Sequence, residues 1–154
     1  MPGVLRALKL AHEQHGKLPW QHLFAPAIAL ARNGFPVSEF HASTPWWRAN
    51  PDIARSPAMA RYFLDKNGKP LPVGTRLRNP ELAQTFEQIA AHGPQAFYTG
   101  EIAGAIVAKV RSHTNAGYLS LQDLEQYTAK EREPVCGTYK AWRVCGMPPP
   151  SSVG

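Results

Sequence analysis

Two histidines near the start of the chain, His12 and His15, enclose a glutamate and are the first residues that could bind a metal. The zinc-protease motif places two histidines four residues apart, so that both imidazoles reach one ion from adjacent helical turns. Here the spacing is three, and no third ligand follows at metal-ligand spacing. The other histidines, His22, His41, His92 and His113, stand alone. We therefore interpret the pair as surface or half-buried helix residues and expect neither a metal site nor a cofactor.

The two cysteines, Cys136 and Cys145, belong to two short β-prone runs, residues 134–138 and 142–147, on either side of a tight turn at residues 139–141. This pattern predicts a β-hairpin. A turn with an even number of residues would place the cysteines directly opposite each other, within reach of a cross-strand disulfide. An odd number would shift the register and separate them. The sequence leaves both arrangements open, with two ordinary thiols as the default.

Composition and local motifs identify no catalytic residue. The chain contains no Gly-x-Ser-x-Gly elbow, phosphate-binding loop or dinucleotide fingerprint. Its formal net charge is +6, but the basic residues are scattered and form no run of five or six. This favours a solvated, mildly basic surface over a nucleic-acid footprint, so we expect no nucleic-acid partner. No run of about 18 apolar residues occurs, so we expect no membrane span.

The elements that must hold these residues are predicted to be mainly helical. Asn79 as N-cap and Pro80 at the first helical position open the clearest helix, and Ser120 with Asp123 predicts a capped short one. Pro26 lies within the second predicted helix, which must either start near it or kink there. The expected helices cover residues 5–16, 19–33, a stretch from 38, 80–92, a stretch from 99 or 100, and 120–127.

Apolar spacing also predicts which helix faces are buried. The first helix should bury Leu5, Leu8 and His12. The later faces comprise Leu82, Phe86, Ile89 and Ala90 in one helix and Ile102, Ile106, Val107 and Val110 in the next. Residues 71–77 are interpreted as an irregular or short extended link, and we expect sheet only at the end of the chain.

The hairpin and the segment after it indicate that the chain belongs to a larger fold. A lone two-stranded ribbon is marginal in water, so this one needs a sheet to join. The residues that follow it predict a rigid connector, because prolines fix φ and lack a donor: Pro148, Pro149, Pro150, Ser151 and Ser152. The predicted fold class is α+β, a mostly helical fragment with a C-terminal β-hairpin.

The order of several segments resembles the γ-glutamyltranspeptidase family, also called glutathione hydrolase, in the later part of its large subunit. The matching stretches are residues 2–4 (P-G-V), 18–35, 79–83 (N-P-E-L-A), 93–100 (G-P-Q-A-F-Y-T-G), 119–124 (L-S-L-Q-D-L), 132–135 (R-E-P-V) and 147–152 (M-P-P-P-S-S). Together they cover nearly the whole chain in the right order.

The resemblance implies an N-terminal nucleophile hydrolase fold, with two stacked sheets between helical layers (αββα), made as one precursor that cuts itself into two subunits. It implies transfer of the γ-glutamyl group of glutathione to water or to an amino acid or peptide acceptor. The nucleophile is the threonine freed at the start of the small subunit, whose α-amino group can act as the base. Oxyanion donors and a cation for the substrate carboxylate complete the site.

Almost none of that machinery carries over to this sequence. None of its seven threonines lies in the Thr-Thr-His context of the family's cleavage site. The small subunit would lie beyond Gly154, and the family's carboxylate-binding arginine would precede Met1. At Val153 the family usually has glycine, and a β-branched residue there could disturb a backbone that needs glycine freedom. We therefore expect residues 1–154 to be a partial large-subunit domain, inactive alone, with the small subunit as its obligate partner.

The resemblance also implies a localisation, and two alternative functions remain open. The full-length family member is expected to be periplasmic or extracellular, although residues 1–6 lack the features of a secretory signal. One alternative is a non-catalytic truncated remnant or helical interaction domain, which predicts exposed apolar surface. The other is a basic nucleic-acid module, which predicts binding that weakens steeply with salt.

Overall fold

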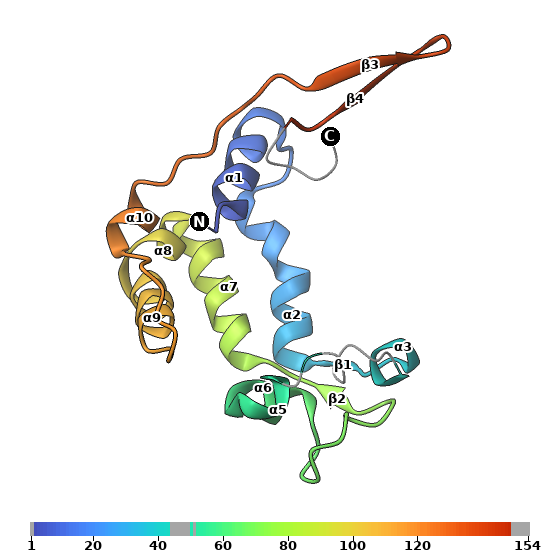
Figure 1. Ribbon diagram of the computed structural model, residues 1–154, viewed down its shortest axis with the longest axis vertical. Helices are drawn as coiled ribbons and strands as arrows, with labels where there is room; N and C mark the ends of the chain where they lie inside the picture. The colour runs from blue at the N-terminus through green and yellow to red at the C-terminus, as the bar shows by residue number, and fades with distance from the viewer. Residues whose placement is uncertain (1, 44–49, 51, 149–154) are drawn as a thin grey trace.

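The computed structural model describes residues 2–43, 50 and 52–148, and it has the mixed, mainly helical architecture that the sequence predicts (Figure 1). Its helical elements are α1 (Val4–His15), the 3-10 helix η1 (Trp20–Phe24), α2 (Ala25–Asn33), α3 (Glu39–Ser43), α5 (Asp52–Arg55), α6 (Pro57–Phe63), α7 (Pro80–His92), α8 (Gln95–Tyr98), α9 (Gly100–Arg111) and α10 (Leu121–Glu125). Its strands are β1 (Phe35–Pro36), β2 (Arg76–Leu77), β3 (Val135–Tyr139) and β4 (Trp142–Gly146).

Helices α2 and α7 lie side by side and form the central pair of the structure (Figure 1). Small buried side chains, Ala31 on α2 and Ala83 on α7, let the two backbones approach, and the N–H of Asn79 donates to the carbonyl of Ala31 at 2.8 Å. Asn79 is also the N-cap of α7, as predicted, because its side-chain oxygen accepts from the N–H of Leu82 at 2.9 Å.

The proline inside the second predicted helix determines where its α-helical part begins. Residues Trp20–Phe24 form the 3-10 helix η1, and α2 starts at Ala25 with Pro26 in its first turn. That position suits proline, since the N–H groups there have no intrahelical acceptor. The helix therefore starts around Pro26 and is not kinked by it.

The prediction that sheet occurs only at the end of the chain was wrong. β1 and β2 pair antiparallel, with Phe35 opposite Leu77, so the link at residues 71–77 ends in a strand. Gly34, at φ 79°, turns the chain out of α2 into β1. Each strand is two residues long and carries no alternation of polar and apolar side chains, so the sequence held no periodic signal for this long-range pairing.

Two of the predicted buried faces are confirmed in part. On α7, Ile89 is buried as predicted, and Phe86 and Ala90 are half-buried. Leu82 is 39 % exposed, and Ala83 is buried beside it because α7 meets α2 through this small residue.

On α1, Leu5 packs against the cluster of α8, α9 and α10 as predicted and His12 is half-buried, whereas Leu8 is 54 % exposed. Periodicity thus located both helices and most of each buried face, and it misplaced one leucine on each.

A cluster of buried side chains lies where α8, α9 and α10 meet. Tyr98, Ala103, Val107 and Leu124 form this cluster, and three of them are fully inaccessible to solvent. The predicted cap of α10 is present as a reciprocal capping box at Ser120. Among residues 2–43, 50 and 52–148, no helix has the length and apolar character needed to cross a membrane.

Candidate functional site

The β3–β4 hairpin brings together the two cysteines that the sequence singled out. Its turn has two residues, Lys140 and Ala141, which is an even number. Cys136 therefore lies directly opposite Cys145 in the strand register, with their Cα atoms 4.1 Å apart. The structure joins the two sulfur atoms as a disulfide.

The hairpin has two unlike faces, because successive side chains along a strand point to opposite sides. One face is apolar and consists of Val135, Tyr139, Trp142 and Val144, each exposed by 58 % or more. The other face carries the disulfide together with Thr138 and Arg143, which also lie opposite each other. The two faces can therefore serve different purposes.

The predicted connector begins at Pro148, the last described residue, directly after the hairpin. Pro149, Pro150, Ser151 and Ser152 lie outside the described residues, as does Val153. Their role as a rigid connector stays a prediction.

A long arm leads from α10 to the hairpin and runs past α1 (Figure 1). Between the arm and α1 lies an open groove of about 730 Å³, lined mainly by α1 and by residues 129–134. A side-chain hydrogen bond of 2.8 Å from Gln14 to Glu131 fastens the arm to the end of the helix. The N-terminal helix thus positions the hairpin relative to the helical body.

Tyr98 fastens the start of the chain to this body. Its buried hydroxyl donates to the carbonyl of Pro2 at 2.7 Å and accepts from the backbone N–H of Arg6 at 3.3 Å. The Arg6 guanidinium lies 4.6 Å from the ring centroid, in cation–π geometry. Burial raises the pKa of the Tyr98 hydroxyl above its ordinary value.

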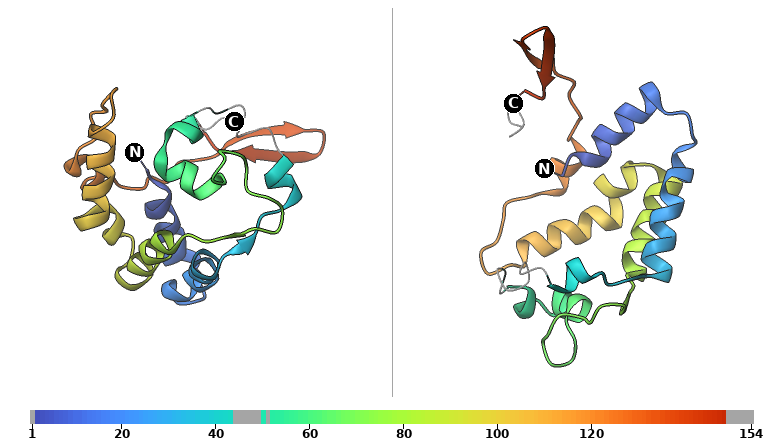
Figure 2. Two further views of the ribbon diagram at one scale, coloured as in Figure 1. Left: turned by 90° about the horizontal axis from the view of Figure 1, so that it is seen from below. Right: turned by 90° about the vertical axis from the view of Figure 1, so that its right-hand side faces the viewer.

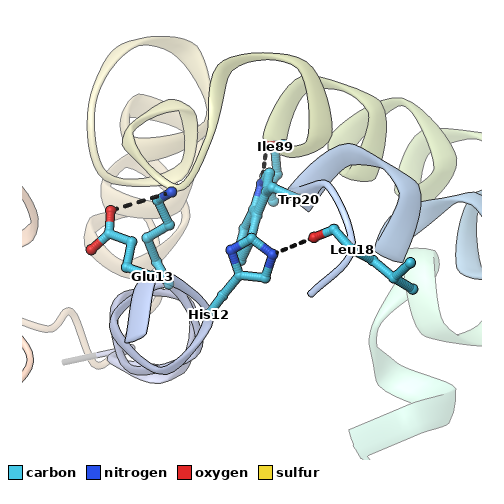
Figure 3. A network of polar contacts seen from close by, with 6 residues as sticks. His12, Glu13, Leu18, Trp20 and Ile89 are labelled. Carbon is cyan, nitrogen blue, oxygen red and sulfur yellow. Dashed lines mark hydrogen bonds and ion pairs between the residues drawn. The ribbon is translucent and has the colours of Figure 1, made fainter. Parts of the chain in front are cut away.

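His12 takes part in a network that also ties α1 to the body (Figure 3). Its Nε2 atom lies 2.7 Å from the carbonyl oxygen of Leu18, and its ring meets Trp20 edge-on. The indole N–H of Trp20 donates to the carbonyl of Ile89 on α7 at 3.1 Å. In the described part of the chain, no three His, Cys, Asp or Glu side chains gather as a metal site would need. His12 is thus occupied by a structural contact.

The hydroxyl groups of two described threonines are bound to backbone carbonyls and thus have structural roles. The hydroxyls of Thr85 and Thr99 donate to the carbonyls of Glu81 and Gln95, four residues earlier in each case. The sequence does not predict the hydrogen bonds of Tyr98, since a buried tyrosine carries no signal for a partner 96 residues away. The described residues therefore form a helical scaffold that holds the hairpin. The sequence predicts no nucleophile–base pair in this scaffold.

The comparisons with known proteins agree along the whole chain. The family model described as "Gamma-glutamyltranspeptidase" matches residues 1–154. Glutathione hydrolase 2 of Arabidopsis thaliana is 38% identical over 154 residues, which are 100% of this chain and 26% of the plant protein. The Acylase ACY 1 proenzyme of Pseudomonas sp. (strain SE83) is 36% identical, over 100% of this chain and 27% of its own length.

The solved structures give the same result. The crystal structure of the Helicobacter pylori γ-glutamyltranspeptidase superposes with a TM-score of 0.88 at 30% sequence identity, covering 99% of this chain and 43% of that one. The chain thus spans about a quarter of the length of the curated relatives described above, and under half of the solved chain.

Proposed function

Since the chain belongs to the γ-glutamyltranspeptidase family, we propose that it is part of an enzyme that transfers the γ-glutamyl group of glutathione to water or to amino acid or peptide acceptors. The observation that carries this proposal is the 38% identity to a protein named glutathione hydrolase over all 154 residues. The fold likeness at a TM-score of 0.88 supports it independently of residue identity.

In this proposal residues 1–154 are a partial large-subunit domain of an αββα N-terminal nucleophile hydrolase. The nucleophilic threonine, its α-amino base and the oxyanion donors belong to a small subunit encoded beyond Gly154. The name "proenzyme" of the Pseudomonas relative is in keeping with a precursor that is processed. The chain alone is then inactive, and the small subunit is its obligate partner.

The hairpin supports the proposal that this chain is one part of a larger fold. Its apolar face, formed by Val135, Tyr139, Trp142 and Val144, is uncovered in the described structure, and a two-stranded ribbon is marginal by itself. In the proposal this face packs into the sheets of the larger fold, and the connector after Pro148 continues the backbone into it. The whole protein is then periplasmic or extracellular, as expected for the family.

A second candidate is an acylase that cleaves other amides, because a relative of that name is 36% identical over the same 154 residues. The two candidates share the covalent mechanism and differ in the acyl group that the site accepts. A γ-glutamyl donor carries a free α-carboxylate and α-amino group, so recognition of these charges separates the two activities.

The test compares the purified 154-residue chain with the longer reading frame that contains it. Each is assayed for release of a chromophore from a γ-glutamyl amide and from an amide of an uncharged acyl group. We expect turnover of the γ-glutamyl amide by the longer product alone. Activity of the 154-residue chain would contradict the placement of the nucleophile, and a longer product active only on the uncharged amide would favour the acylase.

A further inference from the structure

The turn of the β3–β4 hairpin is made of residue types that do not favour a tight turn. It consists of Lys140 and Ala141, and Lys140 has a φ of 52°, in the left-handed region that is sterically unfavourable for residues other than glycine. In the described part of the chain, no other non-glycine residue has a positive φ. Two-residue hairpin turns usually carry glycine or asparagine at such a position. The turn therefore contributes little to fixing which residues of the two strands face each other.

The cross-strand pairs of the hairpin are also weak. Val135 lies opposite Gly146, and Val144 lies opposite Gly137, so each of these valines faces a residue without a side chain. Contacts between directly opposite side chains stabilise an antiparallel pair, and glycine-rich strands specify their register poorly. Of the five residue pairs, the one next to the turn alone joins two large apolar side chains. A slip of one residue would move every apolar side chain of the slipped strand to the other face.

The disulfide is the cross-strand link that admits one register. Cys136 and Cys145 lie directly opposite each other, and a shift of either strand by one residue would turn one sulfur atom to the other face of the hairpin. The hairpin projects away from the helical body, as the right-hand view of Figure 2 shows. Its register is therefore left to the ribbon itself.

We propose that the Cys136–Cys145 disulfide is a register lock, which holds the hairpin in one pairing before the ribbon joins a sheet. The apolar face then stays in one piece and meets the rest of the whole protein as a unit. The docking step rests on the proposed function, in which the hairpin becomes part of a larger fold. The lock acts before that step, so it does not depend on which faces of the hairpin are covered afterwards.

Formation of the lock requires an oxidant, which is a second disulfide, carried by a protein or a small molecule. The thiolate of one cysteine attacks that disulfide, forms a mixed disulfide and releases one thiolate of the oxidant. The other cysteine, as its thiolate, then attacks the protein sulfur of the mixed disulfide, which forms the Cys136–Cys145 bond and releases the second thiolate. Two protein sulfurs are oxidised and the two sulfurs of the oxidant are reduced. Such oxidants operate in the periplasm and outside the cell, in keeping with the proposed localisation.

The first experiment measures how well the hairpin holds together. Hydrogen exchange of the peptide that spans residues 134–147 is followed by mass spectrometry in the oxidised 154-residue chain, in the same chain with reductant, and in the double variant Cys136→Ser, Cys145→Ser. We expect exchange in the oxidised chain to be about tenfold slower than in the other two, with equal exchange of α7 in all three. Equal exchange of the hairpin in all three samples, or a chain without the disulfide after oxidative purification, would overturn the proposal.

The second experiment replaces the lock by a better turn. Lys140→Gly with Ala141→Asn places glycine at the position of positive φ and gives a pair typical of two-residue turns. Added to the double cysteine variant, this pair of changes should restore slow exchange of residues 134–147. Lys66→Gly with Ala116→Asn makes the same two changes at exposed positions outside the hairpin and should restore nothing. A turn pair that fails to restore protection would refute the claim that the disulfide supplies the register.

The third experiment tests the docking step in the longer reading frame that contains the chain. Its product is refolded with and without reductant, and pulsed hydrogen exchange records when residues 134–147 become protected. Reduction should delay this protection, and Lys140→Gly with Ala141→Asn should remove the delay. Equal times with and without reductant would contradict the docking step. Because the readout is folding, absence of γ-glutamyl transfer by the refolded product would count against the proposed function alone.

Discussion

Replacing Tyr98 by phenylalanine tests whether the start of the chain is held by one hydroxyl group. The ring stays in the cluster with Val107 and Leu124, while the hydrogen bonds to the carbonyl of Pro2 and from the N–H of Arg6 are lost. The N–H of Arg6 lies in the first turn of α1, where no intrahelical acceptor exists. An unsatisfied buried group costs about 1–3 kcal/mol, so we expect the free energy of unfolding to fall by about 2 kcal/mol.

Urea denaturation followed by circular dichroism measures this change. With an m-value of about 2 kcal/mol/M, a loss of about 2 kcal/mol lowers the midpoint by about 1 M. Tyr118→Phe is the matched control, since Tyr118 is 99 % exposed and should shift the free energy by less than about 0.5 kcal/mol. Equal midpoints for the two variants would refute the importance of the Tyr98 hydroxyl.

The pH dependence provides a second check on the same group. Burial raises the pKa of Tyr98 above 10.0, so folding favours the protonated hydroxyl. Its stabilisation is complete below the ordinary pKa of tyrosine and is lost as the pH rises through the higher pKa of the folded state. The stability difference between the wild type and Tyr98→Phe should therefore narrow above pH 10. A difference that stays constant through the alkaline range would contradict the assigned cause.

Three further predictions concern the caps of α7 and α10 and the ion pair between α2 and α7. Asn79→Ala should destabilise the chain by about 1 kcal/mol in urea denaturation, while Asn79→Asp keeps an acceptor for the first turn of α7 and should retain most of the stability. The hydroxyl and N–H of Ser120 lower the pKa of Asp123, so the stability from this cap should be lost as the pH falls through that lowered value. Asp123→Asn should abolish that part of the acid dependence, and Ser120→Ala should raise the Asp123 pKa in an NMR titration. The exposed ion pair of Arg32 and Glu87 should give a coupling below about 1 kcal/mol in a double-mutant cycle, and a larger value would mean that it fixes α2 on α7.

Local chemistry made the starts of α7 and α10 predictable from the sequence. The caps at Asn79 and Ser120 are formed by neighbouring residues, so their geometry follows from a few adjacent letters. The same is true of the hairpin, whose turn separates two β-prone runs. Predicting the disulfide required knowing whether that turn has two or three residues. Composition does not reveal this difference of one position.

The missed features all depend on contacts between distant parts of the chain. The pairing of β1 with β2 joins residues about 40 apart through strands too short to show a period. Which side of α7 is buried depends on the approach of α2, and the small Ala83 fits there better than Leu82. The partner of the Tyr98 hydroxyl is a backbone carbonyl, which every residue possesses. Sequence patterns fix a helix more readily than its neighbours, because periodicity is local and packing is not.

The distribution of apolar surface explains why a scaffold and a hairpin occur together in this chain. Within the described residues, ten apolar side chains are buried, whereas seventeen large ones are exposed. Single exposed apolar residues are ordinary, but those of the hairpin share one face, and such clustering marks a surface that another element covers. The opposite face has the reverse character, with Arg143 beside the disulfide. The apolar face is therefore the surface of the hairpin that we expect another part of the whole protein to cover.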